Sequence, residues 1–153
     1  MTGSALDGEI RSGRHRQPVR VYYEDTDFSG VVYHASYLRF MERGRTNYLR
    51  LIGADHRALF EQTEKEAPGF AFVVRSMAIE FLKPAHMDDV LEIRTHPIEV
   101  KGASVLLRQR ITRADELLID AQVRVAFVSG GRARPIPKTL RIAMRAGADA
   151  MPG

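Results

Sequence analysis

The chain has 153 residues, which suits one domain with a sizeable core, and its composition is that of an ordinary globular protein. It has no cysteine, so disulfide frameworks, thiolate zinc sites and a cysteine nucleophile are excluded. The formal net charge is +4, but arginines gather near the two ends and charges are mixed between them, which argues against a nucleic-acid function. No apolar run approaches the roughly 20 residues that cross a bilayer, so we expect a cytoplasmic protein without a transmembrane segment.

The two ends of the chain are predicted to lie outside the folded part. Residues 1–17 lack the apolar segment of a secretory signal and are predicted to form a disordered tail. Residues 18–144 are predicted to form a single domain, because neither a linker nor an internal repeat divides them. Residues 145–153 are predicted to be a flexible C-terminal tail.

The predicted domain begins with a strand and a long helix. Polar and apolar residues alternate over residues 19–25, which predicts a strand, and turn-forming residues follow. Residues 36–52 have helical periodicity, with an apolar stripe on one side and arginines on the other. Gly53 is predicted to stop this helix, and Gly44 indicates that the helix backbone lies directly on a sheet. A second, short helix is expected over residues 54–66.

The rest of the domain is predicted to be strand, over residues 70–81, 90–96, 104–112 and 117–128. In the first of these, one apolar face is predicted to contain Ala71, Val73, Met77, Ile79 and Phe81. Short connections between strands imply antiparallel neighbours. The sequence thus predicts an α+β fold in which a long central helix packs on a curved antiparallel five-stranded sheet, the arrangement called a hot dog. One helix covers only part of five strands, so we expect a homodimer or homotetramer.

Acidic residues and a histidine gather where the first strand meets the long helix. Glu24, Asp25 and Asp27 precede the helix, and His34 lies near its entrance. A helix N-terminus supplies unpaired N–H groups and a positive dipole end, which would polarise a thioester carbonyl and stabilise an oxyanion. A carboxylate on the loop could then attack that carbonyl or deprotonate a water molecule.

Two other interpretations stay open from the residues alone. An aspartate before a helix is most often a cap or an Asx-turn. The acidic residues could also bind a metal ion together with His34, but one histidine does not complete a recognised ligand spacing. We therefore expect neither a metal ion nor another cofactor.

The segment 22–50 resembles the signature of the 4-hydroxybenzoyl-CoA thioesterase class of hot-dog enzymes. It is most similar to the YbgC-like branch, the acyl-CoA thioesterases associated with the Tol–Pal system. The resemblance runs from about Pro18 to Leu140. Its matching residues lie in the runs 19–27, 30–37, 42–46, 72–75, 83–89 and 134–138.

The resemblance implies a hydrolase that converts an acyl-CoA thioester to a free acid and CoA. It implies that Asp27 is the catalytic carboxylate, as nucleophile or general base, and that the helix N-terminus at His34 polarises the carbonyl. Tyr23 is implied to lie near the site. Hot-dog enzymes commonly hold the CoA phosphates with basic side chains near a subunit interface, and the candidates for substrate binding here are Arg75, Lys83 and Lys101.

The implied partner is the acyl-CoA substrate, and the basic surface also suits docking of an acyl carrier protein. An alternative function is a binding module with little turnover, which would recognise acyl carrier protein or an envelope complex. That role admits peripheral association with the inner face of the cell membrane. A dehydratase is a weaker alternative within the same fold, because those enzymes place a histidine and an acid differently.

Overall fold

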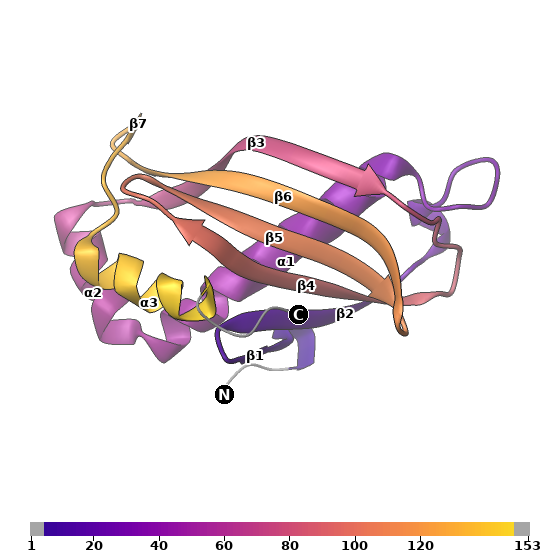
Figure 1. Cartoon of the computed structure of the whole chain (residues 1–153), viewed down its shortest axis with the longest axis horizontal. Coiled ribbons are helices and arrows are strands. Elements are labelled where there is room, and N and C mark those ends of the chain that lie inside the picture. Colours follow the sequence, from indigo (N-terminus) through magenta and orange to yellow (C-terminus); the bar gives the residue numbers. More distant parts are fainter. Residues whose placement is uncertain (1–4, 149–153) are drawn as a thin grey trace.

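The computed structural model describes residues 5–148, and Figure 1 shows one curved antiparallel sheet crossed by a long helix. The strands are β1 (Glu9–Arg11), β2 (Arg14–Arg20), β3 (Ala71–Phe81), β4 (Val90–Val100), β5 (Ser104–Arg113), β6 (Glu116–Ser129) and β7 (Arg132–Ala133). The helices are α1 (His34–Asp55), α2 (Arg57–Glu66) and α3 (Lys138–Ala148), with short 3-10 turns η1 (Ala5–Asp7) and η2 (Tyr23–Asp25).

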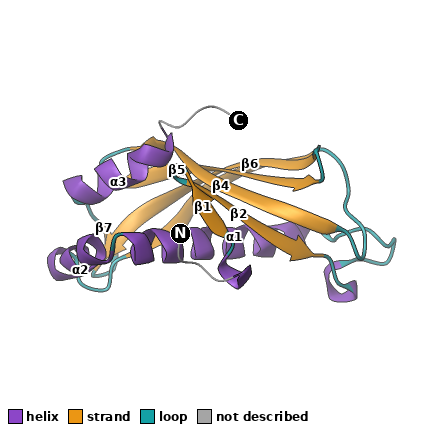
Figure 2. Ribbon diagram, turned by 90° about the horizontal axis from the view of Figure 1, so that it is seen from below, coloured by secondary structure: helices purple, strands orange, loops and turns teal. Residues whose placement is uncertain are grey.

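The sheet has the strand order β1-β2-β4-β5-β6-β3, and β7 pairs with β6. The helix α1 lies along one face, while α3 packs on the other face against β4 (Figure 2). The predicted α+β arrangement is therefore confirmed. The sheet described over residues 5–148 has seven strands rather than the predicted five, because the short β1 and β7 extend it.

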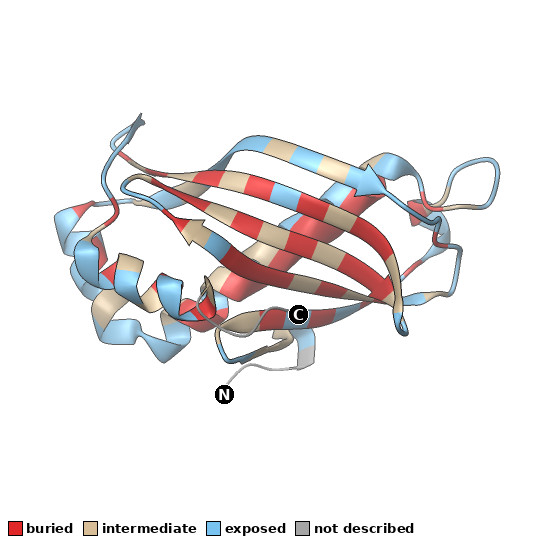
Figure 3. Cartoon of the chain, viewed as in Figure 1, coloured by how far each residue is buried: buried red, intermediate tan, exposed pale blue. Residues whose placement is uncertain are grey.

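The core fills the space between α1 and the sheet. Buried residues alternate with partly exposed ones along β4, β5 and β6 (Figure 3), as expected for strands with one face on a core. Near the start of α1 the core surrounds Tyr37, Phe40 and Met41, and near its end it surrounds Tyr48 and Phe127.

The two glycines of α1 act differently from one another. A Cβ on Gly44 would lie 2.9 Å from Ile93 Cγ2 and 3.1 Å from Thr95 Oγ1, so this glycine allows the predicted close approach to β4. The prediction that Gly53 stops the helix is wrong, because α1 continues to Asp55. A Cβ on Gly53 would lie 3.1 Å from the Phe60 ring, so this glycine instead allows close packing of α2.

The prediction of a disordered tail over residues 1–17 is wrong for its described part. Residues 5–17 contain η1, β1 and most of β2, and the predicted strand over 19–25 begins earlier and gives way to η2. The β2 side chains that face inward include His15 and Gln17, both buried, and Gln17 Oε1 accepts a hydrogen bond of 2.8 Å from Asn47 on α1. Because these inward residues are polar, the alternation of this strand is hidden in the sequence.

The predicted face of β3 is also wrong in its first half. A bulge between Val74 and Ser76 shifts the register against β6. It inserts one residue, so the inward-facing parity changes from Phe72 before the bulge to Met77 and Ile79 after it. Val73 is therefore exposed.

The predicted flexible C-terminal tail begins too early. The helix α3 extends to Ala148, and Met144 and Gly147 are buried in it. A Cβ on Gly147 would lie 2.5 Å from Gly13 O, so α3 packs directly on the turn between β1 and β2. The remainder of that predicted tail, residues 149–153, lies outside the described residues.

Candidate active site

The chain between η2 and α1 forms a compact loop at one end of the sheet, on the right of Figure 1. Thr26 and Val32 pair across this loop, and the Asp27 N–H donates to Val31 O at 2.9 Å. The Tyr33 N–H donates to Asp25 O at 2.9 Å, which ties the start of α1 to η2. The backbone thus holds the acidic segment beside the helix entrance.

Asp27 is exposed on this loop, and its carboxylate is held by Ser29. The Ser29 hydroxyl donates to Asp27 Oδ1 at 2.6 Å, and the Ser29 N–H donates to the same oxygen at 2.8 Å. These hydrogen bonds favour the charged carboxylate, so the Ser29 hydroxyl, above all, lowers the pKa of Asp27. The result is an ionised carboxylate of fixed orientation that remains accessible to solvent.

Asp25 has a different environment from Asp27. It is buried, and its Oδ2 accepts a hydrogen bond of 2.9 Å from the Tyr22 N–H at the start of η2. Its backbone carbonyl accepts the Tyr33 N–H. Asp25 therefore shapes the loop, while Asp27 presents a carboxylate to solvent.

His34 is the first residue of α1, and its side chain is exposed. Its ring lies 4.5 Å from the Tyr33 ring and 6.4 Å from the Phe81 ring, between centroids. Within residues 5–148, no hydrogen bond takes up the His34 backbone N–H. That amide is one of the unpaired donors of a helix N-terminus, which suits it to bind a carbonyl oxygen that gains negative charge.

An apolar hollow of about 240 Å³ lies beside this helix entrance. Its walls come from the loop, α1 and the end of β3, and they consist of Val32, Tyr37, Phe81, Leu82, Lys83 and Pro84. The Phe81 ring lies 6.4 Å from the His34 ring and 6.0 Å from the Tyr37 ring, so it stands between the helix entrance and the hollow. A carbon chain attached to a carbonyl at the helix N-terminus could enter this hollow.

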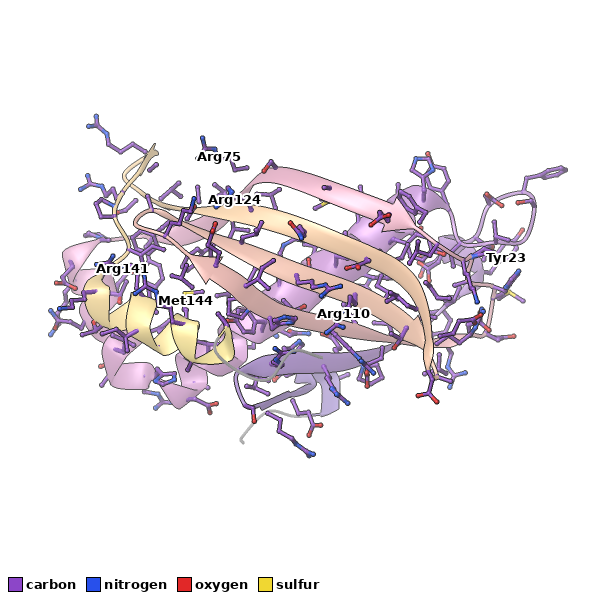
Figure 4. The ribbon with its side chains drawn as sticks, in the orientation of Figure 1. Tyr23, Arg75, Arg110, Arg124, Arg141 and Met144 are labelled. Atoms are coloured by element: carbon purple, nitrogen blue, oxygen red, sulfur yellow. The ribbon has the colours of Figure 1, made fainter. Side chains whose placement is uncertain are left out.

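Tyr23 lies at the same end of the molecule as the active-site loop (Figure 4). It begins η2, its side chain is 81% exposed, and its carbonyl accepts the Thr26 hydroxyl at 2.7 Å. The structure thus places Tyr23 in η2, directly before the loop that carries Asp27. Its ring faces solvent.

The three predicted phosphate-binding residues do not form one cluster within a single chain. Lys83 lines the apolar hollow and forms a salt bridge of 2.8 Å with Glu116. Arg75 lies at the bulge of β3, well away from Tyr23 (Figure 4). Lys101 follows β4 at the end of the sheet opposite the loop, where it pairs with Glu99 at 3.7 Å.

Three residues of this site have roles that were not predicted from the sequence. Ser29 is the partner of Asp27, and the spacing Asp-x-Ser, typical of an Asx-turn, was the signal that could have found it. Tyr37 falls on the apolar stripe predicted for the long helix, and Phe81 on the apolar face predicted for its strand, whereas both also wall the hollow. Only the fold brings the end of β3 next to the start of α1, so no local pattern could reveal that wall.

The described residues contain neither a candidate metal site nor a helix that could span a membrane. Across residues 5–148, no group of three or more histidine, aspartate or glutamate side chains could hold a metal ion. In the same part of the chain, no helix is long and apolar enough to cross a membrane.

Comparison of the sequence with known proteins finds thioesterases. The profile of a family described as the thioesterase-like superfamily matches residues 21–144. The acyl-CoA thioesterase YbgC of Haemophilus influenzae is 46% identical over 128 residues, which cover 82% of this chain and 90% of that protein. The acyl-CoA thioesterase YbgC of Helicobacter pylori is 44% identical over 92 residues, or 60% of this chain and 62% of that protein.

Comparison of the fold gives the same class. A crystal structure of a probable thioesterase from Bartonella henselae is 38% identical, with a TM-score of 0.66, and the match covers 82% of this chain and 99% of that chain. A mutant 4-hydroxybenzoyl-CoA thioesterase in complex with 4-hydroxybenzoyl-CoA has a TM-score of 0.75, over 86% of this chain and 99% of that one. Its identity is 22%, so this likeness is one of fold alone. These neighbours confirm the predicted hot-dog fold.

Proposed function

We propose, since this chain belongs to the thioesterase-like superfamily and is YbgC-like, that it hydrolyses an acyl-CoA thioester to a free acid and CoA. The observation that carries the proposal is the position of Asp27. An ionised, oriented carboxylate lies on a loop that the backbone ties to the N-terminus of α1. The helix entrance in turn borders an apolar hollow.

In this proposal the thioester carbonyl oxygen accepts the unpaired His34 N–H, and the acyl chain enters the hollow beside Phe81. Charge that develops on the oxygen is stabilised by that N–H and by the dipole of α1. The His34 ring lies 6.4 Å from the ring of Phe81, which walls the hollow, and from there it can hold the attacking water or the acyl carbonyl.

Asp27 can act in either of two ways, and each gives a balanced reaction. As nucleophile, its carboxylate attacks the carbonyl carbon, the C–S bond breaks, and the CoA thiolate leaves and takes a proton from solvent. Water then hydrolyses the mixed anhydride to the free acid and regenerates Asp27. As general base, Asp27 instead takes a proton from water, and the resulting hydroxide displaces the thiolate directly. Both roles need the ionised form that Ser29 stabilises.

A second copy of the chain would complete the site. The strand β3 is an edge of the sheet, and it exposes Val73 and Val74 by 46% and 47%. Exposed apolar edges readily pair with another strand. Antiparallel pairing of two β3 strands about their centre would place Arg75 of each copy opposite position 77 of the other, four residues along the strand from the Phe81 position that walls the hollow. We therefore retain Arg75 and Lys83 as phosphate-binding candidates of a homodimer, and Lys101 as a candidate only for a larger homotetramer.

The oligomer prediction is tested by light scattering after size-exclusion chromatography. A Val74→Lys variant places a charge on the β3 edge, and we expect it to convert the assembly to monomers. An exposed position away from that edge, Ile142→Lys on α3, serves as the control. A wild-type monomer would contradict the proposed pairing.

The activity is tested by thiol release from acyl-CoA esters of graded chain length and from an acyl-carrier-protein thioester. We expect saturable thiol release from at least one acyl-CoA. Because acyl-CoA occurs in the cytoplasm, we propose that the protein acts there. Docking of acyl carrier protein and peripheral contact with the inner membrane face stay predictions. Tight binding of these thioesters without thiol release would contradict the hydrolase and support the binding module.

A further inference from the structure

Arginines form a row across three strands on the face of the sheet opposite α1. Arg16 on β2 pairs with Arg94 on β4, and Arg94 pairs with Arg110 on β5. Neighbouring residues face the other way: the space beneath Gly44 of α1 is bounded by Ile93 and Thr95, and Gln109 Nε2 donates to Met41 O. Because side chains alternate along a strand, the three arginines project from the face that α1 does not cover. Figure 4 shows Arg110 on that face.

Such a row destabilises the sheet unless something compensates its charge, because like charges directly opposite each other repel. Arg94 Nε pairs with Glu92 at 2.6 Å. Asp120 lies opposite Arg110 in the register, but two hydrogen bonds of 3.1 and 2.9 Å commit its carboxylate to Arg108. Among residues 5–148, neither Arg16 nor Arg110 has a carboxylate within salt-bridge distance. The described part of the chain therefore neutralises the charge of the row only in part.

The row lines a cavity of about 230 Å³. The cavity is walled by the hairpin of β1 and β2 together with β4 and β5, and its lining contains five arginines and one carboxylate: Arg11, Arg14, Arg16, Arg94, Arg110 and Glu9. Glu9 pairs with Arg11 at 3.7 Å. Arg110 Nε is buried, and among residues 5–148 it finds no hydrogen-bond partner. Burial and then the neighbouring arginines lower the pKa of Arg110, against the smaller opposing effect of the Asp120 charge.

The hairpin that walls this cavity is held in place. Ser12 and Gly13 take left-handed conformations at its turn, with φ of 55° and 75°. Gly13 lies against Gly147 of α3, where a Cβ would approach to 2.5 Å. The superfamily match begins at residue 21, so this hairpin lies outside the matched segment.

The cavity is separate from the candidate active site. Arg94 lies four residues along β4 from Val90, which pairs with Arg20 just before the active-site loop. At about 3.3 Å per residue, the separation along the strand is about 13 Å, and the arginines lie on the opposite face of the sheet from α1.

We infer that this cavity binds a phosphate-type anion, either inorganic phosphate or the phosphate group of a monoester. Guanidinium groups present paired N–H donors that match the oxygens of phosphate. The buried Arg110 Nε is such a donor, and residues 5–148 offer it no acceptor. A volume of about 230 Å³ holds a phosphate group with water, and it is below the roughly 300 to 1,000 Å³ of pockets that enclose larger ligands. The anion neutralises the row that the protein leaves charged.

Calorimetric titration of the full chain tests binding at fixed ionic strength. Inorganic phosphate, adenosine 3′-phosphate and sodium chloride are the three titrants. We expect saturable binding of one or both phosphates at one site per chain and none of chloride. Binding of the free ion alone identifies inorganic phosphate as the ligand, whereas binding of the ester identifies a phosphomonoester. The absence of saturable binding by either phosphate would overturn the inference.

A matched pair of variants locates the site. Arg110→Gln should weaken phosphate binding at least tenfold, whereas Arg124→Gln makes the same charge change on the same sheet face outside the cavity and should leave affinity within twofold. Without phosphate, Arg110→Gln should raise the melting temperature by about 1 to 3 °C because it relieves repulsion within the row. Equal affinity of Arg110→Gln and wild type, or a lower melting temperature of that variant without phosphate, would overturn the inference.

Discussion

Ser29 donates both its hydroxyl and its backbone N–H to one oxygen, Oδ1, of Asp27, at 2.6 and 2.8 Å. This arrangement fixes the orientation of a carboxylate that is exposed to solvent. It also ties the ionisation of Asp27 to a neighbour two residues away, which gives the site a property that can be measured through pH.

The Ser29→Ala substitution removes the hydroxyl hydrogen bond. Because that bond lowers the pKa of Asp27, its loss raises this pKa and moves the acidic limb of the pH–rate profile to higher pH. At pH 7 the carboxylate stays ionised, but it is oriented less firmly without the hydroxyl hydrogen bond. We therefore expect kcat/KM to fall about two- to tenfold. The measurement is kcat/KM for thiol release from pH 4 to 8. Ser29→Thr, which keeps a hydroxyl, should retain the wild-type profile; an unshifted acidic limb in Ser29→Ala would contradict this role.

Phe81 should influence which acyl groups are hydrolysed. Its ring walls the apolar hollow beside His34, so Phe81→Ala enlarges that space. We expect the ratio of kcat/KM for bulky over small acyl groups to rise about tenfold, in the range that differences of one or two methylenes produce in apolar pockets. Ile142→Ala, an exposed change on α3, is the control. An unchanged ratio across the acyl panel would show that the acyl chain does not enter this hollow.

Any side chain at Gly44 should lower the free energy of unfolding. In Gly44→Ala the new Cβ would lie 2.9 Å from Ile93 Cγ2 and 3.1 Å from Thr95 Oγ1, so either α1 or the side chains beneath it must shift. Overpacking of this kind lowers the free energy of unfolding by about 1 to 3 kcal/mol. The matched control is Gly102→Ala, whose Cβ meets no atom within 4 Å. Urea unfolding measures both changes, and equal stability of the two variants would contradict the close approach of helix and sheet.

The buried His96 should make stability depend on pH. Burial, followed by the charges of Arg14, Arg110 and Arg108, lowers its pKa to about 4. An unfolded histidine has a pKa of about 6.5, so as pH falls the unfolded chain binds the proton first. The stabilisation is complete above about pH 6.5 and is lost as pH falls towards 4, with a loss of about 2 kcal/mol already at pH 5.

The variant His96→Gln should reduce that loss between pH 6.5 and 5, as measured by urea unfolding at each pH. Some dependence should remain because burial also lowers the pKa of His15. His56→Gln changes an exposed histidine between α1 and α2 and serves as the control. A pH dependence of His96→Gln equal to that of wild type would contradict this role for His96.

The fold was predictable where one face of an element is apolar. The strand β6 alternates from Ile119 onward, and α1 has a continuous apolar stripe, so both were recognised from periodicity alone. The strand β2 was only partly recognised because His15 and Gln17 occupy its inward positions. The bulge in β3 reverses the faces of that strand, and a bulge leaves no signal in a sequence that is apolar on both sides.

The candidate site was predictable in its local part. Asp27 and His34 lie seven residues apart, on a loop and helix start that their own sequence specifies. The hollow was not predictable, because Phe81 reaches Tyr37 and His34 only through the pairing of β3 with β6. Arg75 and Lys101 were chosen for their charge, and a single chain places them far from Lys83.

The central claim is that Asp27 performs thioester hydrolysis, and its most direct test is kcat for thiol release in Asp27→Asn. The control is Asp115→Asn, which makes the same change at an exposed turn between β5 and β6. We predict that Asp27→Asn lowers kcat by at least 100-fold, the scale of losing a general base, while acyl-CoA still binds and Asp115→Asn stays within twofold of wild type. Wild-type kcat in Asp27→Asn would contradict the claim.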